Sequence, residues 1–383
     1  MTEKVVVIGA GVFGSWTAHH LLQAGRDVTL IDAFGPANSR ASSGGESRLT
    51  RGAYGKDAIY TRMARDSLPE WQALSTRAEL PIYIPAGILF FFPGDQPYVR
   101  DTIAVHEELG LPTEVLDQAA LAQRFPMVDF EGVGIGIFEP GFGALMARRA
   151  VLTLVYEFVR AGGRYLQASA VVSFGSSDRL DELQLSSGEH LGADSFVFAA
   201  GPWLPKLFPE VIGGRIIPTR QEIFFFAPPA GNPRFLPESL PCWADFNDGD
   251  MFYGLPDIES RGVKFAHDIH GPVVDPDTQD RRSSEAALAE IVEYRDRRFP
   301  LLKGAPLTEA RVCQYENSSN GDFLIDFHPR LENVLLVGGG SGHGFKHGPE
   351  VGRYAAGRLL GSVEEEPRFS LASKREAHRR EIY

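Results

Sequence analysis

Cysteine is nearly absent from this chain of 383 residues, which has only Cys242 and Cys313. Two cysteines cannot build the disulfide framework of a small secreted protein, so we expect a reducing compartment, most simply the cytoplasm. Long apolar runs are absent too. Because a membrane-spanning helix needs roughly 18–20 consecutive apolar residues, we expect no membrane partner.

Positive charge is also scarce. The net charge is −12 and no long basic run occurs, which argues against nucleic acids as partners. The ten histidines and two cysteines do not fall at the spacings of metal ligands, so we expect no metal. What the chain has in quantity is core material, since 43% of its residues are hydrophobic and 26 are phenylalanine. This composition and length predict about two globular domains.

A nucleotide-binding pattern opens the sequence. Residues 4–8 form a β-branched run, G-x-G-x-x-G follows as Gly9, Gly11 and Gly14, and a second apolar run ends in Asp32. In this strand–turn–helix–strand order the glycines let a pyrophosphate approach the backbone, and the helix N-terminus supplies N–H donors. The acidic residue at the end of the second strand is placed to bind a ribose. The pattern predicts a bound dinucleotide but does not distinguish NAD from FAD.

The rest of the chain alternates between two kinds of pattern. Helices are expected at 57–74, kinked or interrupted at Pro69, and at 101–125, where residues 109–112 end the first piece. Further helices are expected at 141–163, 285–298 and 351–360. Residues 216–275 instead contain strand-like runs separated by turns, which predicts a mainly antiparallel sheet. Buried runs at 194–200 and 334–337 indicate a return to the nucleotide-binding part. This return favours an FAD fold over an NAD dehydrogenase.

Several motifs connect these pieces to a known family: SRLTRGAYG, MFYGLP, GVKFAHD with DPDT downstream, RVCQY, FLIDFHP and SGHGFK. Together they resemble the D-amino acid oxidase (DAO) superfamily. The similarity is strongest to the branch of monomeric sarcosine oxidase and N-methyltryptophan oxidase, which includes pipecolate and fructosyl-amino-acid oxidases. It covers essentially the whole chain.

The resemblance implies an α/β fold in which a Rossmann-type, glutathione-reductase-like FAD-binding domain joins a mainly antiparallel-sheet substrate domain. We expect the FAD domain at 1–81, 143–214 and 318–383, and the substrate domain at 82–142 and 215–317. The implied enzyme is a monomeric FAD-dependent amine oxidase. It oxidises the C–N bond of a small amine or N-substituted amino acid to an imine and reduces O2 to hydrogen peroxide.

The family also implies roles for individual residues. Cys313 matches the cysteine that bonds covalently to the flavin, and Arg51 and Lys346 match the two cations that hold the substrate carboxylate. An arginine fork and a lysine point charge suit a carboxylate. Lys264 matches the lysine that promotes the reaction with oxygen, and Arg48 a cation beside the flavin ring.

The further contacts that the resemblance implies fall into two groups. Tyr253 and Tyr315 are expected to line the substrate pocket. The expected FAD contacts are Gly9, Gly11, Val12, Phe13, Gly14, Asp32, Ser43, Ser47, Arg48, Val172, Gly201, Trp203, Cys313, Gly340, Gly342, His343, Gly344, Phe345 and Lys346.

Two positions depart from the sarcosine oxidase pattern. Asp268 stands where a histidine is usual, with His267 beside it, and Gly44 stands where another histidine tends to precede the SRLTR run. Strand alternation predicts that Lys264 and Asp268 share a face, unless a bulge turns His267 toward the site. We therefore keep both as candidate catalytic residues and expect a roomier pocket than sarcosine needs.

Alternatives stay open at this point. A fructosyl-amino-acid or pipecolate-type oxidase fits the same motifs, as does a dehydrogenase or an electron-transfer subunit of the same fold. A further alternative is a protein that is not an enzyme, namely a non-catalytic FAD-binding module.

Overall fold

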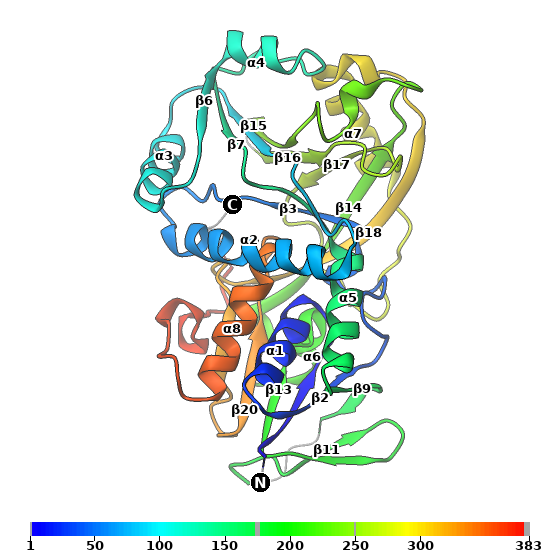
Figure 1. Cartoon of the computed structure of the whole chain (residues 1–383). Coiled ribbons are helices and arrows are strands. Elements are labelled where there is room, and N and C mark those ends of the chain that lie inside the picture. The colour runs from blue at the N-terminus through cyan, green and yellow to red at the C-terminus, as the bar shows by residue number, and fades with distance from the viewer. Residues whose placement is uncertain (1, 173–176, 249, 379–383) are drawn as a thin grey trace.

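The computed structural model describes residues 2–172, 177–248 and 250–378. Figure 1 shows two parts, one around a six-stranded sheet close to the N-terminus and one around an eight-stranded sheet. Helix α2 (Ala58–Ala78) lies across the junction between the two parts. This junction is where the cofactor-binding and substrate-binding motifs meet.

The six-stranded sheet is parallel except at one edge. Its order is β19-β20-β13-β1-β2-β9, and only β19 runs antiparallel to its neighbour. The bounds are β1 Lys4–Ile8, β2 Asp27–Asp32, β9 Arg164–Gln167, β13 Ser195–Phe198, β19 Leu324–Phe327 and β20 Val334–Gly338. Segments from distant parts of the sequence thus form one nucleotide-binding sheet.

Both faces of this sheet are covered because its central strands are apolar on both sides. Val5 and Val7 pack against the helices of one face, whereas Val6 and Ile8 pack against the other. The first face carries α1 (Val12–Gln23), α5 (Ala147–Arg160) and α8 (Gly348–Leu359). The second face carries a small sheet of β10 (Ala170–Val171), β11 (Glu182–Leu185) and β12 (His190–Gly192), together with α6 (Leu204–Leu207).

The eight-stranded sheet has the order β18-β14-β17-β16-β15-β5-β7-β6 and is antiparallel except where β15 meets β5. The bounds are β5 Ile88–Phe92, β6 Glu114–Asp117, β7 Ile135–Glu139, β14 Ile216–Phe226, β15 Cys242–Asp248, β16 Asp250–Leu255, β17 Val263–Asp268 and β18 Leu307–Ser318. Helices α3 (Pro97–Leu109), α4 (Gln118–Arg124) and α7 (Glu285–Arg298) pack around it.

A third, short sheet joins the two parts. It consists of β3 (Ser47–Thr50), β8 (Gly143–Met146) and β4 (Tyr83–Ile84), in the order β3-β8-β4. Strand β3 carries the SRLT motif into the junction. Its side chains are thereby placed between the cofactor sheet and the antiparallel sheet.

The predicted α/β fold with a second, antiparallel part is confirmed, but some elements were wrong. Pro69 does not interrupt α2, because Trp71 and Leu74 beyond it are buried and hold the helix in place. The end of a helix expected at residues 109–112 is confirmed, since α3 ends at Leu109, but strand β6, which pairs with β7, follows before α4. The helix expected from residue 141 begins at Ala147, since strand β8 precedes it.

The described residues contain neither a membrane-spanning helix nor a cluster of metal ligands. No helix there combines the length and the apolarity needed to cross a bilayer. In the same part of the chain, no three or more His, Cys, Asp or Glu side chains group as they do around a metal ion.

Candidate active site

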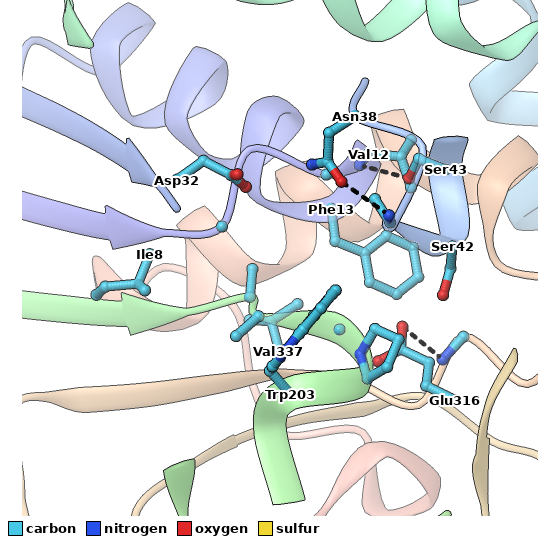
Figure 2. A pocket seen from close by; sticks show the side chains of 18 of the residues that line it. Ile8, Val12, Phe13, Asp32, Asn38, Ser42, Ser43, Trp203, Glu316 and Val337 are labelled. Atoms are coloured by element: carbon cyan, nitrogen blue, oxygen red, sulfur yellow. Dashed lines mark hydrogen bonds between the residues drawn. The ribbon is translucent and has the colours of Figure 1, made fainter. Parts of the chain in front are cut away.

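A cavity of about 300 Å³ opens at the carboxyl ends of the parallel strands. Ile8, Asp32 and Val337 line it from the six-stranded sheet, and Tyr315 and Glu316 line it from β18 of the antiparallel sheet. Figure 2 shows Asp32 at one side of this pocket, Ser42 and Glu316 at the other, and Phe13 between them. In open α/β sheets this edge is where nucleotides bind.

Two of the three glycines of the fingerprint, Gly9 and Gly14, leave no room for a side chain. Gly9 has φ +107°, and a Cβ there would lie 2.3 Å from the carbonyl oxygen of Ala199. A Cβ on Gly14 would lie 1.8 Å from the carbonyl oxygen of Gly9, so this glycine sets how closely α1 packs on β1. Gly11 differs, because the nearest atom to its Cβ position is the Ser43 hydroxyl oxygen at 3.6 Å.

The polar groups at the two ends of the fingerprint suit a dinucleotide. The carboxylate of Asp32 accepts hydrogen bonds from the N–H groups of Ala10 and Phe34, both at 2.8 Å. Burial raises the pKa of this carboxyl group. The N–H of Val12, at the start of α1, donates to the Ser43 hydroxyl oxygen at 3.2 Å. The glycine cradle, the N-terminus of α1 and the carboxylate at the end of β2 fit FAD, whose pyrophosphate would lie at the N-terminus of α1.

A second cluster of polar side chains consists of Arg48, which lines the cavity, Lys264 of β17 and Cys313 of β18. The Ser47 carbonyl oxygen accepts from the Arg48 guanidinium at 2.8 Å and from Nζ of Lys264 at 2.9 Å. Burial, together with Arg48, lowers the pKa of Lys264 to about 7. The Arg48 guanidinium also lies 3.8 Å from Sγ of Cys313. The residues predicted to surround the flavin ring therefore lie together.

Two further cations are buried on the other side of this cluster. Arg51 and Lys346 are each 4% exposed, and both lie over the ring of Tyr54, at 4.1 and 5.2 Å from its centre. Burial and the charge of Arg51 hold the pKa of Lys346 well below its usual value. Nζ of Lys346 donates to the carbonyl oxygen of His343 at 2.7 Å. Such a pair of buried cations is suited to an anionic ligand.

Asp268 lies with these groups and His267 does not. Hydrogen bonds link Tyr315 to Tyr253 and to Asp268, and the Asp268 charge acts on both Arg51 and Lys346. His267 points to the other face of the regular strand β17, where it stacks on Phe252 and its Nδ1 lies 3.0 Å from Oε1 of Glu290. No bulge turns it toward the site, so His267 is withdrawn as a catalytic candidate.

The cavity contacts most of the predicted cofactor residues but not all. Those that line it are Gly9, Gly11, Val12, Phe13, Asp32, Ser43, Arg48, Gly201, Trp203, Gly340, Gly342, Gly344 and Phe345. Val172 does not line the cavity, because its side chain packs into the core with the residues of β11. Ala168, Ser169 and Ala170 line the cavity in its place. His343 turns away to hydrogen bond Tyr54 and the Gly321 carbonyl.

Some residues of the site were missed from the sequence. Glu139 is 1% exposed and accepts the N–H of Gly52 at 2.8 Å, which fixes the loop that carries Arg51. Tyr54 was within the SRLTRGAYG motif but was given no role. Glu139 and Glu316 lie in no motif, and only the fold brings them to the site.

The sequence profile of the FAD dependent oxidoreductase family (DAO) matches residues 4–358. N-methyl-L-tryptophan oxidase of Salmonella agona (strain SL483) is 28% identical over 377 residues, covering 97% of each chain. Among solved structures, L-proline dehydrogenase from P. horikoshii has a TM-score of 0.84 at 19% identity, covering 97% of both chains. Fructosyl amine: oxygen oxidoreductase (Amadoriase I) from Aspergillus fumigatus has a TM-score of 0.79 at 18% identity, covering 97% of this chain and 89% of that one.

The chain belongs to the DAO family of FAD-dependent oxidoreductases. The predicted family, enzyme class and cofactor FAD are thereby confirmed. The two solved structures share the fold with this chain at low sequence identity.

Gly14→Ala should lower the stability of the apoprotein by about 1–3 kcal/mol, because overpacking against the Gly9 carbonyl forces α1 away from β1. Gly11→Ala is the matched control. It should leave the melting temperature of the apoprotein unchanged and weaken FAD binding, since its methyl group meets the cofactor and not the protein. Equal melting temperatures for the two variants would contradict this division of roles.

Proposed function

We propose that this protein is an oxidase of N-substituted amino acids that holds the substrate carboxylate between Arg51 and Lys346. The burial of both cations against the Tyr54 ring is the observation that carries the proposal. The named activity of the relatives, oxidation of N-methyl-L-tryptophan, supports an N-substituted amino acid with a large side chain. Gly44 does not line the cavity, and a Cβ there would lie 2.2 Å from the carbonyl oxygen of Asn38, so this glycine serves the packing of its loop.

Bound FAD would supply the acceptor for the hydride of the carbon next to the substrate nitrogen and would pass its two electrons to O2. The residues of the chain orient the substrate. Arg51 and Lys346 fix the carboxylate, Tyr253 and Tyr315 line the substrate pocket, and Asp268 offers a carboxylate to a polar group on the nitrogen substituent. The substrate amine binds neutral, so no general base is needed. The monomeric state and the cytoplasmic location stay predictions.

We also infer a division of the chain into an FAD domain at 1–81, 143–214 and 318–383 and a substrate domain at 82–142 and 215–317. The membership of the strands supports it, since β5, β7 and β14 to β17 all come from the second set. Strand β18 ends at Ser318, one residue beyond that boundary.

Carboxylated amines should bleach the oxidised flavin band under anaerobic conditions, and N-methyl-L-tryptophan should do so far better than N-methyltryptamine, which lacks the carboxylate. In Arg51→Met the dissociation constant of the carboxylated substrate should rise by about 30-fold, equivalent to about 2 kcal/mol, because a charge-assisted hydrogen bond is lost. Arg51→Lys should recover part of this loss. N-methyltryptamine should respond little to either variant.

Equal effects of Arg51→Met on both amines would reject the carboxylate site. Failure of every N-substituted, cyclic, fructosyl and primary amino acid to bleach the flavin would instead indicate a non-catalytic FAD module. Bleaching without reoxidation by O2 would indicate a dehydrogenase or an electron-transfer subunit.

Covalent attachment of FAD at Cys313 is the second part of the proposal. A partly exposed thiol next to a guanidinium is in the electropositive setting of a reactive cysteine. Acid precipitation should leave yellow flavin on the protein pellet, and Cys313→Ala should release it to the supernatant. Cys242→Ala is the matched control, because that thiol is fully buried and burial raises its pKa. Flavin in the supernatant of the unaltered protein would contradict the attachment.

Lys264 is proposed to promote the reaction with O2 as an ammonium group. Lys264→Met should slow oxygen-dependent turnover by about 100-fold, because a cation that stabilises developing negative charge is removed. Turnover with an artificial dye as electron acceptor should change little. Oxygen-dependent turnover should also fall as pH rises through the pKa of Lys264, since only the protonated form stabilises the charge, and the Met variant should lose this dependence.

Lys56→Met, which removes an exposed lysine, is the control for the Lys264 experiment and should leave both turnovers unchanged. An equal loss with O2 and with dye in Lys264→Met would show that the lysine serves substrate oxidation and not oxygen.

A further inference from the structure

Glu316 is a buried acid in the wall of the FAD cavity with an unused carboxyl oxygen. It is 7% exposed, and Oε1 accepts the N–H of Gly340 at 3.3 Å. Oε2 has no hydrogen-bond partner among the described residues. Figure 2 shows the side chain inside the pocket, across from Phe13 and Val12 at the start of α1.

The surroundings of Glu316 contain glycine backbone in place of side chains. Methyl groups built on Gly340, Gly338 and Gly201 would lie 3.1, 3.4 and 3.7 Å from its carboxyl oxygens. Pro218 of β14 is its partner across the strand pair and carries no charge. The other charged side chains that line the cavity are Asp32, Arg48 and Asp277, and none forms an ion pair with Glu316 within the described ranges. The carboxyl group is thus left without a counterion.

We propose that Glu316 binds the ribityl–pyrophosphate segment of FAD as a neutral carboxylic acid, with Oε2 donating a hydrogen bond to a cofactor oxygen. The position of Glu316 in the cavity favours contact with this segment of FAD. Asp32 marks the ribose end of the cavity, and Figure 2 shows Glu316 toward the other side. The backbone of Gly340 lies against both Glu316 and the ring of Phe13, in the first turn of α1. The middle of FAD offers hydroxyl and phosphate oxygens, which accept hydrogen bonds. An ionised carboxylate there would repel the pyrophosphate, whereas a protonated one supplies the donor.

The chemistry of the free protein agrees with a neutral acid. Burial raises the pKa of Glu316 to about 7, against the opposing effect of the N–H groups of Gly340 and Gly339. A bound pyrophosphate adds negative charge and raises this pKa further. FAD affinity should therefore be full below pH 7 and should fall above it by up to about tenfold per pH unit, until the bound form also loses its proton. This inference needs only the cofactor and stands whatever the substrate.

The test measures FAD binding and not turnover. The Cys313→Ala chain provides reversible binding, and the quenching of free FAD fluorescence gives the dissociation constant between pH 6 and 9. The parent chain should bind progressively more weakly above pH 7. Adding Glu316→Gln, which has the same shape and no ionisation, should make the affinity nearly independent of pH and tighter than the parent at pH 8.5.

Glu350→Gln in the same Cys313→Ala chain is the matched control. It alters an acid whose pKa burial also raises but which does not line the cavity, so it should keep the slope of the parent. A parent without a slope, or a slope that persists in Glu316→Gln, would overturn the proposal. If the Gln variant does not fold, calorimetry of the parent at pH 8 in two buffers of different ionisation enthalpy decides instead. Uptake of up to one proton per FAD supports the neutral acid, and no uptake rejects it.

Discussion

The antiparallel pairing of β14 with β18 is the constraint on which the site depends. Every residue of β14 has a partner in β18, from Ile216 opposite Ser318 to Phe226 opposite Leu307. This long ladder carries β18 from the antiparallel sheet to the mouth of the nucleotide-binding sheet. Cys313 and Tyr315 share one face of that strand and Glu316 lies on the other, because successive side chains alternate in direction. A shift of register by one residue would exchange the two faces.

Buried charge is the second constraint. Arg51, Lys264 and Lys346 are all almost completely excluded from solvent, and Arg48 lies beside them. Asp268 and Glu139 offset part of this charge, and carbonyl oxygens of Ser47 and His343 accept hydrogen bonds from the two lysines. Burial of cations without matching anions is costly. The arrangement is consistent with a protein whose folded state is completed by an anionic substrate and a dinucleotide.

The sequence predicted most of the cofactor end and less of the substrate end. Gly9, Gly14 and Asp32 follow one another in a local strand–turn–helix–strand unit, so their geometry is set by short-range sterics and was readable. Val172 was expected at the cofactor and Ala170 is found there, because small displacements of register in short edge strands leave no local signal. Pro69 was expected to kink or interrupt the helix; α2 runs through it without interruption, since Trp71 beyond it is buried.

The sequence by itself determined the family, the dinucleotide cradle and the face shared by Lys264 and Asp268, because each rests on motifs or on a periodicity of two within a few residues. Only the tertiary structure decided what lies beside them. It placed His267 against Phe252 and outside the site, set Tyr54 under two cations, and brought the carboxyl groups of Glu139 and Glu316 to the junction. Residues that meet in the site lie up to several hundred positions apart in the sequence. Their contacts depend on how the two sheets pack, and no local sequence pattern predicts that packing.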